Sequence, residues 1–370
     1  MNNSYQTIIE IGDTAPDWDD FLSGLECAHH EQSTYWANVK RHQGWKAVRL
    51  KVIRNSDWLA GAQMLCKRLP FGGSIGYIPS GPFYKVPNDP ALDMLVNSIN
   101  AVAKERKIQY VAITPYVEND FLDKIFEKYG YRPTREKLPP TTTVQATLIL
   151  DLSKGLDTLL AEMRGEMRRK IRHALKSGLQ VREGDKSDLD TLFRLMAIVT
   201  ERRGESPTPN RAEVFHHVWD CFNSKGYVKL LVAESEGDPV SIAILFTFGQ
   251  TVRFWKFGWS GAEEKKYPNH LLYWEMIKWS KENGFRYFDF VQVDSTVTDH
   301  LLQGLPVTDE LKSRRLYGST YYKLGFGGKV LKFSGPWFRF QNPLIRTFYN
   351  HFGPSVIESP YMRKIISRIA

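Results

Sequence analysis

The sequence has few cysteines and no cysteine motif. Only Cys27, Cys66 and Cys221 occur in 370 residues, widely spaced and without a C-x-x-C pair. A disulfide framework needs more cysteines, and a zinc cluster needs ligands at close spacing. The sequence therefore argues against a disulfide-rich secreted scaffold and predicts no metal site. The low count suits a reducing cytosol.

Long hydrophobic runs are also missing. The longest apolar stretch lies near 240–248, far short of the roughly 20 residues that a helix needs to cross a bilayer. The first residues, MNNSYQTIIEIGD, lack a basic segment followed by an apolar one, so we expect no signal peptide. These features predict a cytoplasmic protein, and peripheral contact with the inner face of the membrane stays an open alternative.

Positive charge, in contrast, is in excess. The chain has 50 Lys and Arg against 41 Asp and Glu, a net charge of +9. Such a balance favours an anionic partner, such as RNA, a nucleotide-linked substrate or an acidic membrane surface. An apolar content of 42% indicates a globular protein, and the length predicts two or three domains.

Much of this charge gathers in the stretch 156–178. Apolar residues recur there every three or four positions up to Leu175, so we expect one helix of about six turns. A cationic ridge beside that apolar stripe consists of Arg164, Arg168, Arg169, Arg172 and Lys176. One-signed charge over several turns favours a polyphosphate partner, and a solvated helix face is the alternative.

The two halves of the chain repeat one order of elements. Each half has a meander of strands, a long helix, a further strand and a helix that exits through glycine and an aromatic residue. The two exits, 126–131 and 321–326, share an aromatic-x-Lys-x-Gly-aromatic hexad. Self-similarity of this kind predicts a duplication, with domains at 1–150 and 151–335.

A C-terminal tail, 336–370, follows the second predicted domain. Its aromatic residues alternate with Lys and Arg. We expect the tail to pack on the domains, and contact with an anionic membrane is the alternative.

The repeated order of elements is similar to the GNAT acyltransferase fold. It implies an α/β (α+β) chain of two tandem GNAT-like domains, each with a mixed, mostly antiparallel sheet flanked by helices. In GNAT enzymes a glycine-rich turn before the long helix binds the pyrophosphate of coenzyme A. The corresponding positions here read VPNDPALD and EEKKYPNHLL, in which proline removes a donor. We therefore expect no coenzyme A and no other cofactor.

Five segments, in order, resemble landmarks of the FemABX family. They are QSTYWANVKRHQGW, YIPSGP, the basic stretch ending IRHALKSG, YPNHLLYWEMIKWSKENGFRYFDF and YYKLGFGG. These bacterial enzymes are aminoacyl-tRNA-dependent peptidyltransferases of peptidoglycan biosynthesis. The resemblance implies transfer of an amino acid from aminoacyl-tRNA to an amine of a nucleotide- or lipid-linked muropeptide, or of a related peptide acceptor.

The resemblance also assigns candidate site residues. The family's catalytic lysine falls on Lys323, where it would meet the oxyanion of a tetrahedral intermediate or a terminal phosphate of the tRNA. Lys40 matches a lysine that contacts the diphosphate of the acceptor, and Trp36 and Tyr322 are assigned to acceptor binding. The alternatives are an exposed lysine for Lys323, a lysine that complements the helix dipole for Lys40, and core packing for Trp36.

A general base is harder to identify. Asp289 is the candidate, and both it and Asp294 could equally be structural hydrogen-bond acceptors. The family has a glycine pair after the DF dipeptide, where this chain has Val291 and Gln292, and an acidic residue where this chain has Thr114. These departures leave open an acceptor other than an ordinary peptidoglycan precursor.

Some family members carry a coiled-coil arm, which needs heptads sustained over tens of residues, and the sequence has none. The cationic ridge is therefore the expected contact with tRNA. Two other functions stay open. One is a tandem-GNAT N-acyltransferase or peptide-tailoring enzyme with a non-peptidoglycan acceptor, and the other is a non-catalytic RNA- or envelope-associated scaffold.

Overall fold

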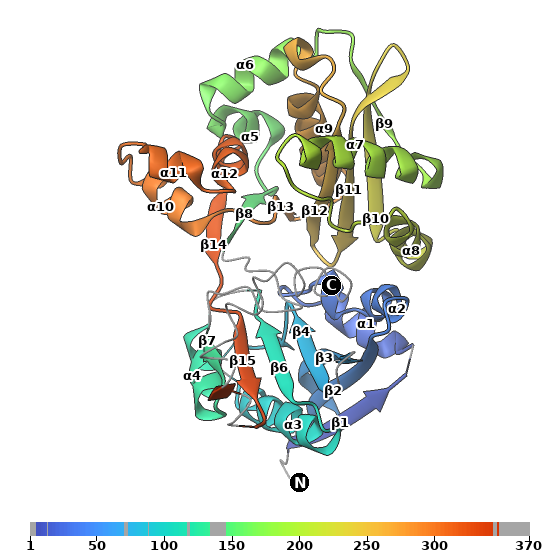
Figure 1. Cartoon of the computed structure of the whole chain (residues 1–370), viewed down its shortest axis with the longest axis vertical. Helices are drawn as coiled ribbons and strands as arrows, with labels where there is room; N and C mark the ends of the chain where they lie inside the picture. Colours follow the sequence, from blue (N-terminus) through green and yellow to red (C-terminus); the bar gives the residue numbers. More distant parts are fainter. Residues whose placement is uncertain are drawn as a thin grey trace. The chain divides into compact units, whose positions relative to one another are not determined.

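The computed structural model describes residues 5–12, 14–69, 73–87, 89–116, 119–133, 146–342 and 346–347. The chain divides into two compact units (Figure 1). The first comprises Met1–Gln145 together with Lys332–Ala370, and the second comprises Ala146–Leu331. The boundary thus falls at 145/146 instead of the expected 150/151, because β8 (Ala146–Asp151) belongs to the sheet of the second unit.

The first unit is built on a sheet with the strand order β1-β2-β3-β4-β6-β15-β7, and β5 pairs with β3. The strands are β1 Tyr5–Ile11, β2 Lys46–Arg54, β3 Asp57–Arg68, β4 Ser74–Pro79, β5 Phe83–Tyr84, β6 Tyr110–Thr114, β7 Arg132–Pro133 and β15 Trp337–Phe340. The described neighbours pair antiparallel, with the exception of β4 and β6, which run parallel.

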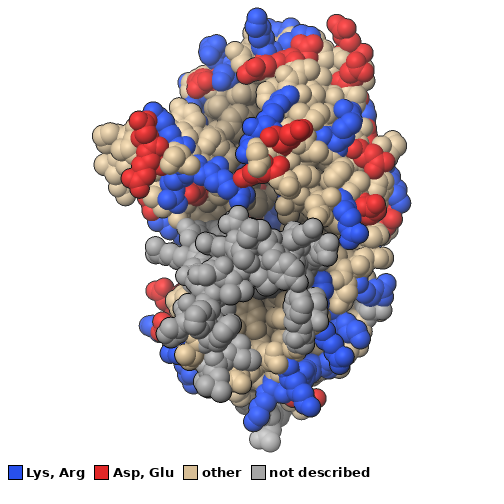
Figure 2. Space-filling view, viewed as in Figure 1, with Lys and Arg blue, Asp and Glu red and all other residues tan. Residues whose placement is uncertain are grey.

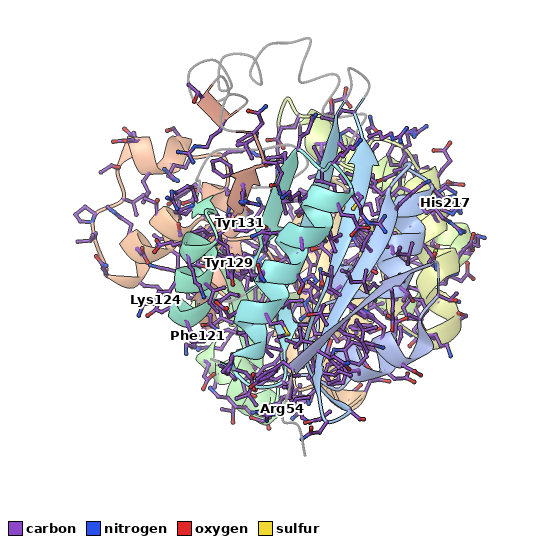
Figure 3. All side chains as sticks on the ribbon, turned by 90° about the horizontal axis from the view of Figure 1, so that it is seen from below. Arg54, Phe121, Lys124, Tyr129, Tyr131 and His217 are labelled. Atoms are coloured by element: carbon purple, nitrogen blue, oxygen red, sulfur yellow. The ribbon has the colours of Figure 1, made fainter. Side chains whose placement is uncertain are left out.

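Two helices cover one face of this sheet. In α3 (Ala91–Glu105), Leu92, Leu95 and Ile99 recur at helical spacing and are buried in the core. The helix α4 (Asp120–Lys128) begins where the Asn119 side chain accepts two backbone N–H bonds. Figure 3 shows Phe121 and Lys124 on α4, and Tyr129 and Tyr131 at its end. The remaining helices of this unit are α1 Pro16–Ser23, η1 His30–Gln32 and α2 Thr34–Arg41.

The second unit has a sheet with the order β14-β8-β13-β12-β11-β10-β9. Its other strands are β9 Gln180–Glu183, β10 Val228–Ser235, β11 Asp238–Phe248, β12 Thr251–Trp259, β13 Tyr287–Asp289 and β14 Lys329–Lys332. Here β12 and β13 form the parallel pair.

Helices cover both faces of the second sheet. On one face, α9 (Pro268–Glu282) packs against α6 (Gly165–Ala174) and against alternate residues of the strands, such as Leu231 and Leu245. On the other face lie α7 (Leu189–Glu201) and α8 (Glu213–Phe222). The other helices are α5 Leu156–Glu162, η2 Lys186–Asp188, η3 Asn223–Lys225, η4 Glu264–Lys266, α10 Ser295–Leu302, α11 Asp309–Ser313 and α12 Tyr317–Leu324.

The two sheets correspond strand by strand. When the second sheet is read from β9, each has a meander of antiparallel strands, then one parallel pair, then two further strands. A long helix, α3 or α9, precedes the second strand of the parallel pair in each unit. This confirms the predicted fold class, in which mixed, mostly antiparallel sheets are flanked by helices, and it supports the predicted duplication.

In each sheet, one inner strand directly follows the other unit in the sequence. β15, after the second unit in sequence, lies between β6 and β7, and β8, after the first unit, lies between β13 and β14. The expected tail at 336–370 therefore begins as an inner strand of the first sheet. Its aromatic and basic residues from 348 onward, and the proline-threonine cluster 138–145, lie outside the described residues.

The predicted single helix at 156–178 is two helices. α5 ends at Glu162 and α6 begins at Gly165, because Met163 and Arg164 are extended, with ψ of 153° and 144°. The Arg164 N–H donates to the Gly325 carbonyl at 2.9 Å instead of continuing α5. Most of the predicted apolar stripe is buried, but Leu175 is 51% exposed.

The described helices are all short. The longest, α3 and α9, have 15 residues each, so the part of the chain that the structure describes contains no coiled-coil arm, as the sequence predicts. Among the same residues, no helix has both the length and the apolar character that crossing a membrane requires.

Candidate active site

Lys323 lies in the last turn of α12 with its side chain buried, 8% exposed. Its Nζ donates to the Gln292 carbonyl at 2.9 Å and to the Val291 carbonyl at 3.1 Å. Burial lowers the pKa of the ammonium to about 8, although the charge of Asp289 opposes this shift. Lys323 is therefore not the exposed lysine of the alternative interpretation. An ammonium has three N–H donors, so one remains for a substrate oxygen.

The two carbonyls that hold Lys323 come from an unusual turn after β13. Val291 has a φ of +56°, a left-handed conformation that a β-branched residue rarely adopts. The Asp289 Oδ1 accepts the Val291 N–H at 2.7 Å and holds this turn. A glycine would adopt the same conformation without strain. The departure from the family's glycine pair thus changes the side chain, while the backbone remains one that glycine favours.

Asp289, the candidate general base, is 1% exposed and tied to its neighbours. The Thr147 hydroxyl donates to its Oδ1, and the Nε of Arg253 lies 3.8 Å from its Oδ2. These contacts favour the structural alternative for Asp289. Its negative charge also favours the protonated form of Lys323, so it can support catalysis through that lysine.

Asp294 has a structural role as the N-cap of α10. Its side chain accepts the Val297 N–H at 3.0 Å and pairs with Arg314 at 2.9 Å. The structural alternative therefore holds for this residue.

The pairing of β12 and β13 ends beside Lys323. The two parallel strands pair only over 251–253 and 287–289, whereas β12 continues to Trp259 with a bulge near Trp255. The Lys323 Nζ lies 5.8 Å from the ring centre of Phe254, the first residue of β12 beyond the paired segment. Ligands of α/β sheets bind at the carboxyl ends of parallel strands, and bulges often occur next to active sites.

Tyr322 lies in an aromatic cluster in the same unit. Its ring centre lies 5.0 Å from that of His270, 5.4 Å from that of Tyr273 and 5.4 Å from that of Phe326. Within the described residues, the Tyr322 hydroxyl and the His270 Nε2 are buried without a hydrogen-bond partner. Burial lowers the pKa of His270 to about 4 and raises the pKa of Tyr322. Such buried polar atoms are rare and often have a functional reason, so His270 joins the candidate site.

A second polar cluster lies at the carboxyl ends of β4 and β6, the parallel pair of the first unit. The Ser80 N–H donates to the Thr114 hydroxyl at 3.2 Å, and the Ser80 hydroxyl donates to the Glu31 carboxylate at 2.7 Å. The amide of Gln32 donates to the Pro79 carbonyl at 2.6 Å and fixes the end of β4. Glu31 thus places a carboxylate near Thr114, where the family's acidic residue is replaced.

Lys40 belongs to this first-unit cluster. Its Nζ lies 5.4 Å from the ring centre of Trp36 and donates to the Gln43 side chain at 3.0 Å. Burial lowers its pKa to about 8; Glu31 opposes this shift and Lys67 adds to it. Trp36 is 7% exposed, so it packs in the core as the alternative interpretation expected, and it also supports the Lys40 ammonium. Tyr322, the third expected acceptor residue, lies in the second unit.

Comparisons with known proteins find similarity in both units. Residues 14–129 match the sequence model of the FemAB family, and residues 161–297 match that of the acetyltransferase (GNAT) domain. The first unit is therefore similar to the FemAB family, and the second unit is similar to GNAT domains. The lipid II:glycine glycyltransferase of Staphylococcus aureus is 29% identical over 214 residues, which cover 55% of this chain and 49% of that protein. The chain therefore spans about half the length of the curated relatives it matches.

Several solved structures share the fold of this chain. The crystal structure of FemX matches with a TM-score of 0.79 and 22% identity, covering 93% of this chain and 99% of that one. L-PGS from Bacillus licheniformis matches with a TM-score of 0.54 and 12% identity, covering 94% of this chain and 98% of that one. A tandem GNAT protein from the clavulanic acid biosynthesis pathway matches with a TM-score of 0.53 and 9% identity, covering 92% of this chain and 99% of that one.

The structure divides the cationic ridge into two groups. Arg164 stacks on the Tyr321 ring at 3.9 Å and donates to the Tyr321 carbonyl, and Arg168 donates to the carbonyls of Ala161 and Met163 at 2.7 Å. These two arginines stabilise the break between α5 and α6. The exposed cations are Arg169, Arg172 and Lys176. Figure 2 shows Asp and Glu side chains among the Lys and Arg side chains near α6.

Side chains lie at the starts of the two long helices, α3 and α9. In the first unit the Asp89 carboxylate accepts the Ala91 N–H at 2.8 Å at the start of α3, where it would repel a phosphate. In the second unit α9 starts with Pro268, which has no N–H. The Arg202 guanidinium lies over the preceding turn, 5.4 Å from the Trp259 ring centre, and donates to the Ser260 carbonyl at 2.6 Å.

No group of three or more potential ligands that could hold a metal ion occurs among the described residues. The polar groups of the second-unit site include Lys323, its carbonyl partners and the buried ion pair of Asp289 with Arg253.

Proposed function

We propose that this chain transfers an amino acid from aminoacyl-tRNA to an amine of a lipid-linked peptidoglycan precursor or a related peptide. The observation that carries the proposal is the buried Lys323 ammonium, held by two carbonyls where the parallel pair β12 and β13 ends. The similarity to a lipid II:glycine glycyltransferase supports the class of acceptor.

The reaction is aminolysis of an ester. The acceptor amine attacks the carbonyl carbon of the aminoacyl ester, a new C–N bond forms, and the carbonyl oxygen becomes an oxyanion. The remaining N–H of Lys323 donates to that oxyanion, a contact that strengthens as charge develops. The ester C–O bond then breaks, and the proton lost by the amine ends on the released ribose hydroxyl. The ester supplies the activation, so ATP is not required.

Lys323 must carry its proton in this mechanism. Burial favours the neutral amine, whereas the charge of Asp289 favours the ammonium. Asp289 keeps its own place through the Thr147 hydroxyl, the Val291 N–H and Arg253. We assign Asp289 the role of a positioning residue that acts through Lys323, in place of the general base that the sequence suggested.

The first unit supplies the acceptor site in this proposal. Lys40 would bind a phosphate of the acceptor, and a cation–π contact with the Trp36 ring would hold its ammonium in place. The Glu31 carboxylate, beside Ser80 and Thr114, is available to hold a cationic or amine group of the peptide. Through Ser80, Glu31 brings a negative charge to the position where Thr114 replaces an acidic residue, which supports an ordinary precursor as the acceptor.

Aminoacyl-tRNA replaces coenzyme A as the donor. Asp89 and Pro268 at the two helix starts disfavour a pyrophosphate there. The exposed cations Arg169, Arg172 and Lys176 on α6 are the proposed contacts with RNA phosphates. No resident cofactor takes part in this mechanism.

A donor competition experiment tests the proposal. The purified protein is given a pool of charged tRNAs, acetyl-CoA and a muropeptide with a free amine, and the modified peptide is identified by its mass. We expect an added amino acid residue. An added acetyl group would contradict the proposal, and a modified non-muropeptide amine alone would support the peptide-tailoring alternative.

A further inference from the structure

The first unit has a pocket lined by arginines, separate from both candidate sites. Its volume is about 210 Å³, and it is lined by Gly130, Arg132, Phe338, Arg339, Phe340 and Arg346. None of these residues belongs to the Lys323 site or to the cluster around Lys40. The pocket lies where β15 pairs with β7, since Phe338 is opposite Arg132 in the register.

Positive charge gathers in the pocket, and none of the described carboxylates compensates it. Arg339 Nη1 donates to the neutral side-chain oxygens of Asn100 at 3.1 Å and Gln341 at 3.0 Å. Arg132 Nη1 donates to the Tyr131 carbonyl at 2.9 Å. In the described ranges, no Asp or Glu pairs with Arg132, Arg339 or Arg346. Like charges repel, so their convergence on one pocket favours an anion that lies between them.

Hydrogen bonds within the protein hold the framework of the pocket. Arg339 stands on the inner strand β15 and is held by Asn100 of α3, which also accepts the Tyr131 hydroxyl at 2.9 Å. Tyr131 is fully buried and follows α4 (Figure 3). Gly130 has a φ of +80°, a left-handed conformation that closes the end of α4. Preorganised donors of this kind reduce the entropy cost of binding.

The chemistry of the lining favours phosphate over carboxylate. Arginine pairs with both groups through parallel N–H bonds, but a carboxylate has only two oxygens, too few to satisfy several guanidinium groups. A phosphate has more oxygens and can carry more charge. The Phe338 and Phe340 rings, 5.6 Å apart, add an apolar surface beside the arginines.

We propose that this arginine pocket binds the phosphate group of a phosphodiester or phosphomonoester ligand, with the rings of Phe338 and Phe340 against the ligand's apolar part. The phosphate can belong to an anionic phospholipid headgroup or to a soluble phosphate ester. This inference does not depend on the proposed transferase activity.

The test uses the full chain and the double variant Arg132→Gln/Arg346→Gln. Both arginines are exposed, so their loss leaves the core intact, whereas Arg339 is left in place because it bonds Asn100 and Gln341. The matched control is Lys104→Gln/Lys124→Gln, which removes the same charge from exposed positions of α3 and α4 in the same unit. Circular dichroism confirms that all three proteins are folded.

Two ligands separate the possible sources. Co-sedimentation measures binding to phosphatidylcholine vesicles with and without phosphatidylglycerol, and calorimetry measures binding of glycerol phosphate. For at least one of them we expect binding by the native protein and by the control, and about tenfold weaker binding by the double variant, the loss of roughly 1.4 kcal/mol. Loss with vesicles alone identifies a lipid headgroup, and loss with glycerol phosphate identifies a soluble ester. Equal binding affinity of the double variant and the control would overturn the proposal. No binding of either ligand by the native protein would also overturn it.

Discussion

At the scale of single residues, function depends on how one buried ammonium is kept charged. Lys323 is surrounded by protein, and two backbone carbonyls and a distant carboxylate offset the loss of water. The carbonyls are in position because Val291 adopts a left-handed conformation. The residue after it, Gln292, supplies the shorter of the two hydrogen bonds, at 2.9 Å.

Replacing Lys323 by methionine tests its role in the reaction. Methionine keeps the approximate length of the side chain but has no donor, so we expect turnover to fall about 10²- to 10³-fold, the loss typical of one oxyanion donor. Thermal unfolding should show a folded protein, since removing a buried charge offsets the two carbonyl bonds that are lost. The matched control is Lys329→Met, at an exposed lysine of β14, which should keep native turnover. Turnover of Lys323→Met within a factor of about three of the native value would remove Lys323 from the mechanism.

The pH dependence gives a second test at this residue. Lys323 donates only when protonated and its pKa is lowered to about 8, so activity should fall as the pH rises through about 8. Asp289→Asn keeps an oxygen for the Val291 N–H but removes a charge that raises the pKa of Lys323. The fall in activity at alkaline pH should therefore begin at a lower pH in this variant. A fall that begins at an unchanged pH would show that Asp289 does not act through Lys323.

At the scale of elements, hydrophobic periodicity predicted the order of strands and helices but not where one helix ends. The apolar spacing continues unbroken through Leu159, Met163 and Met167, all buried, so periodicity alone does not reveal the break between α5 and α6. The break depends on the bond from Arg164 to the Gly325 carbonyl, far along the chain. Tertiary contacts of this kind override local periodicity.

In the candidate site, too, some residues could be predicted from local sequence and others depend on tertiary contacts. Lys323, Lys40 and Trp36 could be identified because they lie in segments that resemble a family. Thr147 could not, since it reaches Asp289 across 142 positions of sequence. His270 stands within one of the recognised segments, but only its burial and its unpartnered Nε2 draw attention to it.

The divided ridge predicts two different effects of charge reversal. Replacing Arg169, Arg172 and Lys176 together by glutamate should weaken binding of tRNA and flatten its dependence on salt, because these exposed cations are the proposed phosphate contacts. The melting temperature should change little. Arg164→Glu should instead lower the melting temperature, since Arg164 stacks on Tyr321 and bonds its carbonyl. Unchanged binding and salt dependence in the triple variant would remove α6 from the RNA site.

At the scale of the whole molecule, the two units are linked by the course of the chain. The first sheet needs β15, which the chain supplies only after completing the second unit. On β15, Trp337 is 3% exposed and packs 5.4 Å from the ring of Phe126, so the strand also completes the first core. The second sheet, in contrast, is formed by one continuous stretch of chain, from β8 to β14.

Fragments of the chain should therefore behave differently. The segment 146–331 should unfold cooperatively by itself, whereas 1–145 alone should not, because its sheet ends at β6 without the strand that joins β7. Joining 332–347 to the first fragment through a flexible linker should restore a cooperative transition in urea. Cooperative unfolding of 1–145 alone would show that β15 is dispensable.

The most direct measurement is the mass of a lipid-linked muropeptide after incubation with charged tRNA and either the native protein or Lys323→Met. A gain equal to one amino acid residue, dependent on the charged tRNA and lost or strongly slowed in the variant, is the predicted result. An unchanged mass with the native protein, or the same gain at the same rate with Lys323→Met, would contradict the account.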